Sequence, residues 1–254
     1  MRNGTGLGQA FRTITIIPFP GRDAKKQSTQ LFFYPIVGLV IGAIGSALIY
    51  LCNADNQSIL KSILLASVWT AYMAFITRCF HLDGLGDTAD GFGGGWTREK
   101  RLEIMKDSRS GSFAVIAITL CLLIKTTAAA ITINNNEQEM LMWSVVLSRT
   151  MVVLLCTTSR YAKESGLSYD LVSGAKAGHA ITAILEACAI GAGLYFLMGT
   201  AITGILVPAA SALLVTIVIS ITSRKKIGGV TGDVLGACAE LAEVCALLGL
   251  SFVK

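Results

Sequence analysis

The chain has 254 residues, of which 53% are hydrophobic and 15% are charged, and its formal net charge is +5. Ordinary soluble domains carry about 25% charged residues, so this composition excludes a typical soluble protein and indicates one that crosses a membrane several times. Seven cysteines are scattered singly and only two histidines are present. This pattern excludes a multi-histidine metal centre and a Cys/His zinc site, and no disulfide is expected.

Seven apolar stretches of about 20 residues are each long enough to cross a hydrocarbon core of roughly 30 Å as a helix. Residues 1–31 precede them as a cytoplasmic or interfacial segment, because their apolar patch is short and holds two prolines. The sequence predicts one membrane-embedded, all-α helical bundle over residues 1–254. The spans are expected at Phe32–Leu51, Ile59–Phe80, Ser112–Ile133, Met140–Thr158, His179–Met198, 200–220 and Val234–Val253.

Positive charges alternate between the connections of these spans. Of the 21 Lys and Arg residues, five precede the first span, six lie after the second or at its end (counting Arg78), three precede the fifth and three precede the seventh. The alternate connections, at 52–58, at 134–139 and near residue 199, contain none. Cytoplasmic loops are enriched in Lys and Arg, so we expect the N-terminus in the cytoplasm and the C-terminus outside.

An acidic segment, His81–Gly91, directly follows the second apolar stretch and reads HLDGLGDTADG. On a helix, Asp83, Asp87 and Asp90 are spaced i, i+4 and i+7 and therefore share one face. Three like charges on one face repel each other, so a cation is needed to stabilise them. Ligands that are all oxygen favour Mg²⁺ carrying phosphate over zinc. A solvated acidic cap is the alternative, but a helix cap needs only one Asp.

Glycines and a histidine complete this segment. Gly84, Gly86 and Gly91 weaken a helix but would let a bulky ligand approach the backbone closely. On a helix His81 lies away from the three Asp, so a general base and a residue that orients or packs are both open interpretations. Because residues 81–111 lie between the second and third spans, we expect an active-site loop there, facing the cytoplasm.

A short helix is expected in the polar part of this loop. It begins at the N-cap Thr97 and stops near Gly111. Glu103 and Asp107 are spaced i, i+4 on it, which gives a second carboxylate pair on one face, with Arg109 among the surrounding cations.

Two cations lie near the middles of predicted spans. A lone charge at that depth costs at least ~2.5 kcal/mol, so Lys125 and Arg149 should each face a polar partner. Glu186, Glu240 and Glu243 are the acids available within the spans. An ion pair that joins helices and an anion-binding group in an active cleft are both open interpretations. The second suits Arg149, because a guanidinium group binds phosphate with two parallel hydrogen bonds.

The last span begins at a glycine-rich turn. Asp233 follows Gly228–Gly232, and such a turn presents free N–H groups to an anion. The chain has neither a P-loop nor a Gly-x-Gly-x-x-Gly motif, so a P-loop ATPase or a dinucleotide-binding domain is not expected. No nucleic-acid partner is expected either.

Three segments strongly resemble the cobalamin synthase family, whose members are adenosylcobinamide-GDP ribazoletransferases: His81–Gly91, Arg101–Gly111 and Gly229–Glu243. The resemblance covers nearly the whole chain in order, and one departure is Ser168, where the family pattern has glycine. Further similarity lies in the segments Ile17–Pro20, Phe33–Gly42 and Arg160–Leu167.

The resemblance implies a multipass enzyme of the bacterial or archaeal inner membrane. It would join adenosylcobinamide-GDP to α-ribazole or α-ribazole 5′-phosphate, release GMP and require Mg²⁺, and docking of other late enzymes of cobalamin synthesis is a further expectation. Asp83, Asp87 and Asp90 would then hold the metal, and one carboxylate would take the proton of the attacking hydroxyl. The further candidates for contact with substrate or phosphate are Lys125, Arg149, Arg160, Arg109, Asp107, Glu103, Asp233 and Glu240.

Two other classes of protein stay open. A CDP-alcohol phosphotransferase-like enzyme also uses spaced Asp residues, but its pattern has Ala-Arg after the first Asp-Gly, and this chain lacks it. A transporter would place polar groups at the membrane midplane on broken helices. Lys125, Arg149 and Glu186 give that interpretation some support, whereas the acids outside the hydrocarbon and the scarcity of proline within the spans oppose it.

Overall fold

The structure is a computed structural model that describes residues 5–53 and 58–253. Residues 1–4 of the predicted N-terminal segment and residues 54–57 of the first predicted connection lie outside this description. In the described residues the chain forms helices, together with one isolated parallel bridge between Tyr161 and Val230. The all-α fold is therefore confirmed.

Seven of the described helices are long and apolar enough to cross a membrane, which confirms the predicted number of spans. These helices are α2 (Tyr34–Cys52), α3 (Ile59–Ile76), α6 (Ser112–Asn134), α7 (Glu139–Thr158), α9 (Ala177–Met198), α10 (Ile202–Ile227) and α11 (Gly232–Ser251). The shorter helices are α1 (Gly6–Ile14), the 3₁₀ helix η1 (Gln27–Phe33), α4 (Phe80–Gly94), α5 (Arg98–Ile104) and α8 (Tyr169–Ser173).

Helices α7 and α11 form the centre of the bundle. Most of their residues are buried within the protein, whereas less than half of each of the other five long helices is buried. The outer helices expose many Leu, Ile and Phe side chains. Exposed apolar surface of this kind fits a lipid environment, because lipid tails are as apolar as the side chains themselves. In lipid, the helices that carry polar groups lie at the centre, where those groups find partners within the protein.

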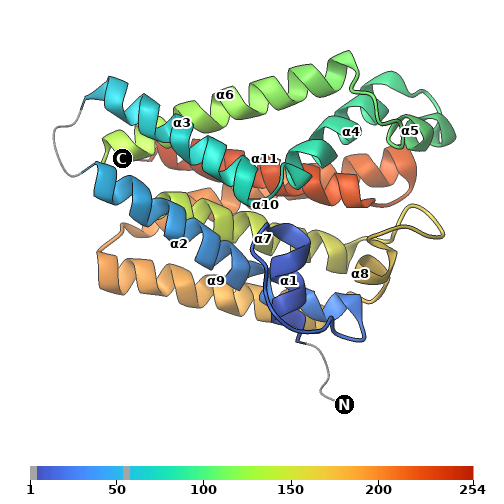
Figure 1. Cartoon of the computed structure of the whole chain (residues 1–254), viewed down its shortest axis with the longest axis horizontal. Coiled ribbons are helices and arrows are strands. Elements are labelled where there is room, and N and C mark those ends of the chain that lie inside the picture. Colours follow the sequence, from blue (N-terminus) through green and yellow to red (C-terminus); the bar gives the residue numbers. More distant parts are fainter. Residues whose placement is uncertain (1–4, 54–57, 254) are drawn as a thin grey trace.

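The elements that carry the acidic segment, the short helix after it and the glycine-rich turn gather at one end of the bundle (Figure 1). Helices α4 and α5, the connection after α7 and the beginning of α11 all lie there, at the right of the view. The end of α2, the beginning of α3 and the short connections from α6 to α7 and from α9 to α10 lie at the opposite end, as does the end of α11.

The second span ends earlier than its composition predicts. Helix α3 stops at Ile76, and Arg78 and Cys79 then adopt positive φ angles of 55° and 54°, which reverses the chain before α4 begins. The carbonyl at the end of α3 is not left free, because Ile76 O accepts a hydrogen bond of 2.8 Å from the Ile16 backbone. The N-terminal segment thus stabilises a helix end that hydropathy alone cannot locate.

The glycines of the acidic segment serve helix packing, which corrects the expectation that they admit a ligand. A Cβ atom on Gly84 would lie 2.7 Å from the carbonyl oxygen of Asp233 on α11. One on Gly86 would lie 3.1 Å from a side chain of α6, and one on Gly91 would collide with Met105 after α5. Three neighbouring segments therefore approach α4 at positions where a side chain is absent, and this approach brings α4 against the beginning of α11.

Candidate active site

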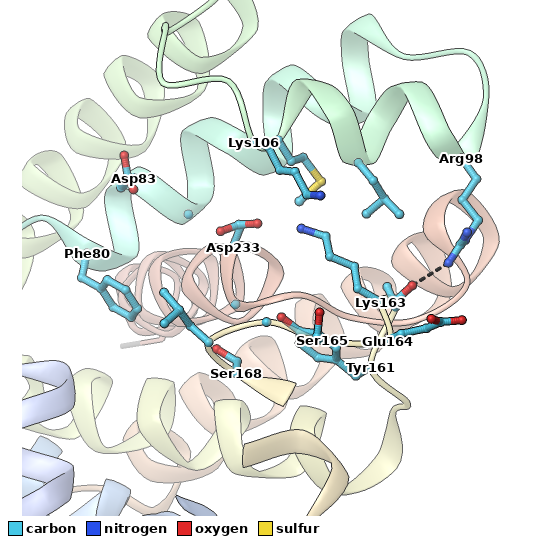
Figure 2. Close-up of a pocket in the computed structure, with 17 residues that line it drawn as sticks. Phe80, Asp83, Arg98, Lys106, Tyr161, Lys163, Glu164, Ser165, Ser168 and Asp233 are labelled. Atoms are coloured by element: carbon cyan, nitrogen blue, oxygen red, sulfur yellow. Dashed lines mark hydrogen bonds between the residues drawn. The ribbon is translucent and has the colours of Figure 1, made fainter. Parts of the chain in front are cut away.

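A cavity of about 760 Å³ opens at the end of the bundle where the acidic segment lies (Figure 2). Its walls come from α4, α5, the loop 161–168 and the first residues of α11. The charged residues that line it are Asp83, Arg98, Lys106, Lys163, Glu164 and Asp233. This cavity is therefore the candidate active site.

Two carboxylates from different helices face this cavity. Asp83 is exposed on α4, and Asp233 is half-buried in the first turn of α11. The Thr231 hydroxyl caps α11 by accepting from the Val234 backbone N–H at 3.3 Å, and it also lies 3.1 Å from Asp233 Oδ2. The N-cap that the glycine-rich turn provides thus fixes the position of Asp233, and the contact at Gly84 places Asp83 beside it.

Asp87 does not line the cavity, but its carboxyl group belongs to the same acidic cluster. Partial burial, together with the carboxylates of Asp83, Asp233 and Asp90, raises the pKa of Asp87 to about 7. The nearby ammonium of Lys163 acts in the opposite direction and does not offset them. The cluster is therefore short of positive charge, as the sequence predicts for three Asp residues on one helix face.

The donor set of this cluster fits Mg²⁺ in its chemistry. All of its side-chain donors are carboxylate oxygens, and their mutual repulsion is what a divalent cation would relieve. Within the described part of the chain, however, no group of three or more His, Cys, Asp or Glu residues is placed so that it could hold a metal ion. The assignment of Asp83, Asp87 and Asp90 as metal ligands stays a prediction that rests on the type and charge of the donors.

Asp90 has partners that the sequence does not reveal. Its Oδ2 accepts from the Gly111 backbone N–H at 2.6 Å, and its Oδ1 accepts from Ala114 N–H at 2.9 Å. Both carboxylate oxygens thus stabilise the N-terminus of α6, where the backbone N–H groups have no partner within the helix. The spacing on α4 is as expected, but this residue has a structural role that its two neighbours lack.

His81 is buried, and its Nδ1 has no hydrogen-bond partner. Burial lowers the pKa of His81 well below its ordinary value, and the positive charges of Arg149 and Lys125 lower it further. The imidazole is therefore neutral and lies outside the cavity lining. This placement favours packing or orientation over a direct catalytic role, the two interpretations that the sequence leaves open.

Lys125 and Glu240 form the buried ion pair that joins α6 to α11. Lys125 Nζ lies 2.6 Å from Glu240 Oε2 and 3.2 Å from Glu243 Oε1. Arg149 Nη1 on α7 lies 4.0 Å from Glu243 Oε2 and donates to the Ser148 hydroxyl at 2.7 Å. None of these residues lines the cavity. The geometry favours the interpretation of this cluster as a connection between three helices over contact of Lys125, Arg149 and Glu240 with phosphate.

The carboxylate pair expected on the short helix does not share a face. Thr97 is the N-cap as predicted, but α5 ends at Ile104, so Asp107 lies beyond the helix. Asp107 instead binds Arg109 at 2.7 Å, and this hydrogen bonding lowers the pKa of Asp107 to about 2. Glu103 pairs with Lys100 at 2.8 Å on the surface. Neither Glu103, Asp107 nor Arg109 lines the cavity.

Arg160 lies next to the cavity rather than in it. Its Nε donates to the Gly228 carbonyl at 2.7 Å, and its own carbonyl accepts from Val230 N–H at 2.9 Å. These bonds hold the loop that begins at Arg160 against the turn before α11.

Sequence reasoning overlooked the cations that do line the cavity, Arg98, Lys106 and Lys163. Arg98 Nε donates to the Ile227 carbonyl at 2.9 Å, so that side chain joins α5 to the end of α10. Lys163 belongs to the segment Arg160–Leu167, whose resemblance to the family was the one signal that could have identified it.

A family model described as Cobalamin-5-phosphate synthase matches residues 6–251. The chain belongs to this family. It is 38% identical to an adenosylcobinamide-GDP ribazoletransferase of Chlorobium chlorochromatii, over 94% of this chain and 92% of that relative. It is 37% identical to a protein of the same description from Prosthecochloris aestuarii, over 97% and 98% of the two chains. No solved structure matches the chain.

Membership of the cobalamin-5-phosphate synthase family confirms the resemblance found in the acidic segment and in the turn before α11. A third relative, the adenosylcobinamide-GDP ribazoletransferase of Syntrophobacter fumaroxidans, is 36% identical over 95% of each chain. The cavity therefore lies in a membrane-embedded transferase family of cobalamin synthesis, and the CDP-alcohol phosphotransferase and transporter interpretations gain no support.

Proposed function

We propose that this chain joins adenosylcobinamide-GDP to α-ribazole or its 5′-phosphate and releases GMP. The curated relatives carry the name of this activity, and the similarity extends over nearly the full length of both chains. The observation that locates the reaction is the cavity, whose lining includes the carboxylates of Asp83 and Asp233 and the ammonium groups of Lys106 and Lys163.

The proposed reaction is a phosphoryl transfer. The 3′-hydroxyl oxygen of the ribazole attacks the phosphorus on the cobinamide side of the diphosphate, a new P–O bond forms, and the bond from that phosphorus to the bridging oxygen breaks. GMP leaves with the bridging oxygen, and the hydroxyl proton passes to a carboxylate of the acidic cluster. In such reactions the protein mainly positions the reactants and stabilises negative charge.

Asp83, Asp87 and Asp233 would hold Mg²⁺. Asp233 takes the place of the predicted ligand Asp90, whose two carboxylate oxygens already accept hydrogen bonds from backbone N–H groups. The bound ion would neutralise the charge of the diphosphate and of the leaving phosphate. The residues of the chain itself align the two substrates, because α4 and α11 are fixed against each other at Gly84 and the loop 161–168 closes the opposite wall of the cavity. Asp90 contributes indirectly in this proposal by holding α6 against α4.

We also propose that the cavity faces the cytoplasm from the inner membrane. The connections rich in Lys and Arg all lie at the end of the bundle that contains the cavity, and positive charge is retained on the cytoplasmic side of inner-membrane proteins. Both substrates would then reach the site from the compartment in which soluble nucleotides occur. Docking of other late enzymes of the pathway at this face remains a prediction.

The test uses the full chain purified in detergent, with adenosylcobinamide-GDP and either acceptor, in the presence and absence of Mg²⁺. Formation of the cobalamin product and GMP is expected only with Mg²⁺. Asp83→Asn should lower the rate by roughly 100-fold or more, because it removes a charge that acts directly on the diphosphate site. Asp170→Asn is the matched control, since Asp170 is an exposed carboxylate outside the cavity and should leave the rate unchanged.

The outcomes separate the proposed function from the metal assignment. Full activity of Asp83→Asn, or turnover undiminished by a chelator, would contradict the assignment of Mg²⁺ to this cluster. Absence of GMP release by the wild-type chain would contradict the transferase reaction. Accumulation of an intact substrate inside vesicles would favour transport instead.

A further inference from the structure

A smaller cavity, separate from the candidate active site, lies where the end of α7 meets the end of α10. Its volume is about 240 Å³, and we call it the polar pocket. The polar side chains that line it are those of Thr158, Ser159, Arg160, Ser220, Ser223 and Arg224. Among the described residues no Asp or Glu lines this pocket. Its wall therefore combines two positive charges with several hydroxyl groups and offers no carboxylate.

The two arginines of the polar pocket are suited to a phosphate group. In the described part of the chain neither Arg160 nor Arg224 takes part in an ion pair. Arg160 Nε donates to the Gly228 carbonyl at 2.7 Å, a bond that restrains the guanidinium without using its Nη groups. Arg224 lies exposed in the last turn of α10. Because a guanidinium binds phosphate with two parallel hydrogen bonds, this pair of arginines beside hydroxyl donors favours a phosphate ligand.

An apolar groove continues from the polar pocket toward the middle of the bundle. Its volume is about 820 Å³, and helices α7, α9 and α10 line it, almost entirely with apolar side chains. The groove lining ends at Leu154 on α7 and at Leu213 on α10. The polar pocket begins about one turn further along α7, at Thr158, and about two turns further along α10, at Ser220, which is roughly 6 and 10 Å along the two axes. Positions at these spacings share a helix face, so the polar pocket and the apolar groove lie on the same side of both helices.

The pocket and the groove together match a molecule with an anionic head and an apolar tail. A soluble phosphate would occupy the polar pocket and leave the apolar groove without a ligand. The groove opens beside side chains that face the lipid, among them Leu206 and Leu213, which are 58% and 42% exposed. Basic pockets between membrane-spanning helices bind the phosphate head groups of lipids in this way. A zwitterionic head group also carries a cation, for which the lining of the polar pocket has no carboxylate.

We infer that the polar pocket and the apolar groove bind one anionic phospholipid of the leaflet nearest the candidate active site. Its phosphate lies between Arg160 and Arg224, and one acyl chain lies along α7 and α10. The bound lipid joins the beginning of the loop 161–168 to α10, because Arg160 directly precedes that loop. The loop forms one wall of the candidate active site, so the lipid steadies that wall from outside the cavity.

The experiment measures lipid binding to the full chain in detergent, after native lipid has been removed. Dioleoyl phosphatidylglycerol or dioleoyl phosphatidylcholine is titrated, and Kd is obtained from the rise in thermal unfolding temperature. Phosphatidylglycerol should bind roughly 10-fold more tightly or better, and Arg224→Gln should weaken its binding by roughly 10-fold, as expected for the loss of one charge-assisted hydrogen bond. Lys225→Gln is the matched control, because it removes the same charge at the next, exposed position of α10, outside the polar pocket. Its Kd should stay within about twofold of the wild-type value.

A second pair of variants tests the acyl chain. Ala210→Phe places a ring in the apolar groove and should weaken the binding of both lipids, whereas Leu214→Phe, at an exposed position of α10 outside the groove, should weaken neither. Glycerol 3-phosphate, which has the head group without the tail, should not raise the unfolding temperature at the concentration at which phosphatidylglycerol does.

Three results would overturn the inference. The first is equal affinity for the two lipids, and the second is an equal loss in Arg224→Gln and Lys225→Gln, which would reduce the effect to general attraction between charges. The third is stabilisation by glycerol 3-phosphate equal to that by the lipid, which would make the ligand a soluble phosphate. The measurement requires no turnover, so its outcome is independent of the proposed transferase reaction.

Discussion

The buried ion pair between Lys125 and Glu240 offers a direct test of what holds the centre of the bundle together. The Lys125 side chain is 2% exposed and that of Glu240 is 6% exposed, and their charged atoms are 2.6 Å apart. The surface pair Lys100–Glu103 has almost the same separation, 2.8 Å, but its side chains are 55% and 70% exposed. The two pairs therefore differ mainly in their access to water.

This difference predicts very unequal costs for the same substitution. Lys125→Met leaves Glu240 and Glu243 buried near each other without the cation that contacts both, and breaking a buried pair in this way costs about 3–5 kcal/mol. Lys100→Met removes an exposed pair that contributes at most about 1 kcal/mol. Arg149 Nη1, at 4.0 Å from Glu243 Oε2, would remain beside that carboxylate, but among the described residues it forms no ion pair with Glu240 and so does not replace Lys125.

The assay is reversible unfolding of the purified chain in mixed detergent micelles. We expect Lys125→Met to lower the free energy of unfolding by about 3 kcal/mol or more, and Lys100→Met to lower it by less than about 1 kcal/mol. The double variant Lys125→Met with Glu240→Gln should recover at least about 1 kcal/mol, since it no longer buries an unpaired carboxylate at position 240. Equal effects of the two single variants, or strict additivity in the double one, would refute the reasoning.

Two other predictions concern the acidic segment. Asp87→Asn should raise the thermal unfolding temperature of the metal-free chain more at pH 8 than at pH 5, while lowering transferase activity at both. The sign follows from the pKa of Asp87 in the folded chain, which is raised to about 7, because folding then disfavours the charged carboxylate. The resulting destabilisation grows as pH rises from the ordinary carboxyl pKa to about 7, and Asn removes it. An increase in unfolding temperature of equal size at pH 5 and pH 8 would contradict this. Gly84→Ala should destabilise the fold by about 1–3 kcal/mol and reduce activity, because the new Cβ would lie 2.7 Å from the backbone of Asp233. Gly94→Ala on the same helix, whose Cβ would meet only a side-chain atom at 3.5 Å, is the control, and equal losses in the two variants would show that the close approach of α4 to α11 is unimportant.

The spans were predictable from sequence because their signal is local. Apolar length alone locates α6 and α7 to within a residue or two at each end. The spacing of Asp83, Asp87 and Asp90 likewise predicts a shared helix face, because i, i+4 and i+7 neighbours coincide on any α-helix. Features of this kind depend on positions a few residues apart and need no knowledge of the tertiary structure.

The rest depends on contacts between distant segments. The end of α3 at Ile76 depends on a hydrogen bond from Ile16, and the role of Asp90 depends on the N–H groups of α6 more than twenty residues away. The same holds for Gly84, whose missing side chain is explained by Asp233 on α11. Polar groups at helix ends must find partners, but the sequence does not say which segment supplies them.

The contrast between the two acidic clusters of the molecule indicates where function constrains the fold. Within the bundle, Glu240 and Glu243 are paired with Lys125 and Arg149, so the chain is able to pair its carboxylates where stability requires it. At the cavity, Asp83, Asp87 and Asp233 form no such ion pair among the described residues, and partial burial together with repulsion among the carboxylates keeps the pKa of Asp87 near 7. A fold selected for stability alone would remove that repulsion by one substitution to Asn, since the nearby ammonium of Lys163 offsets it only in part. The unpaired carboxylates are therefore best explained by a cationic ligand of the proposed reaction, which relieves the repulsion only when it is bound.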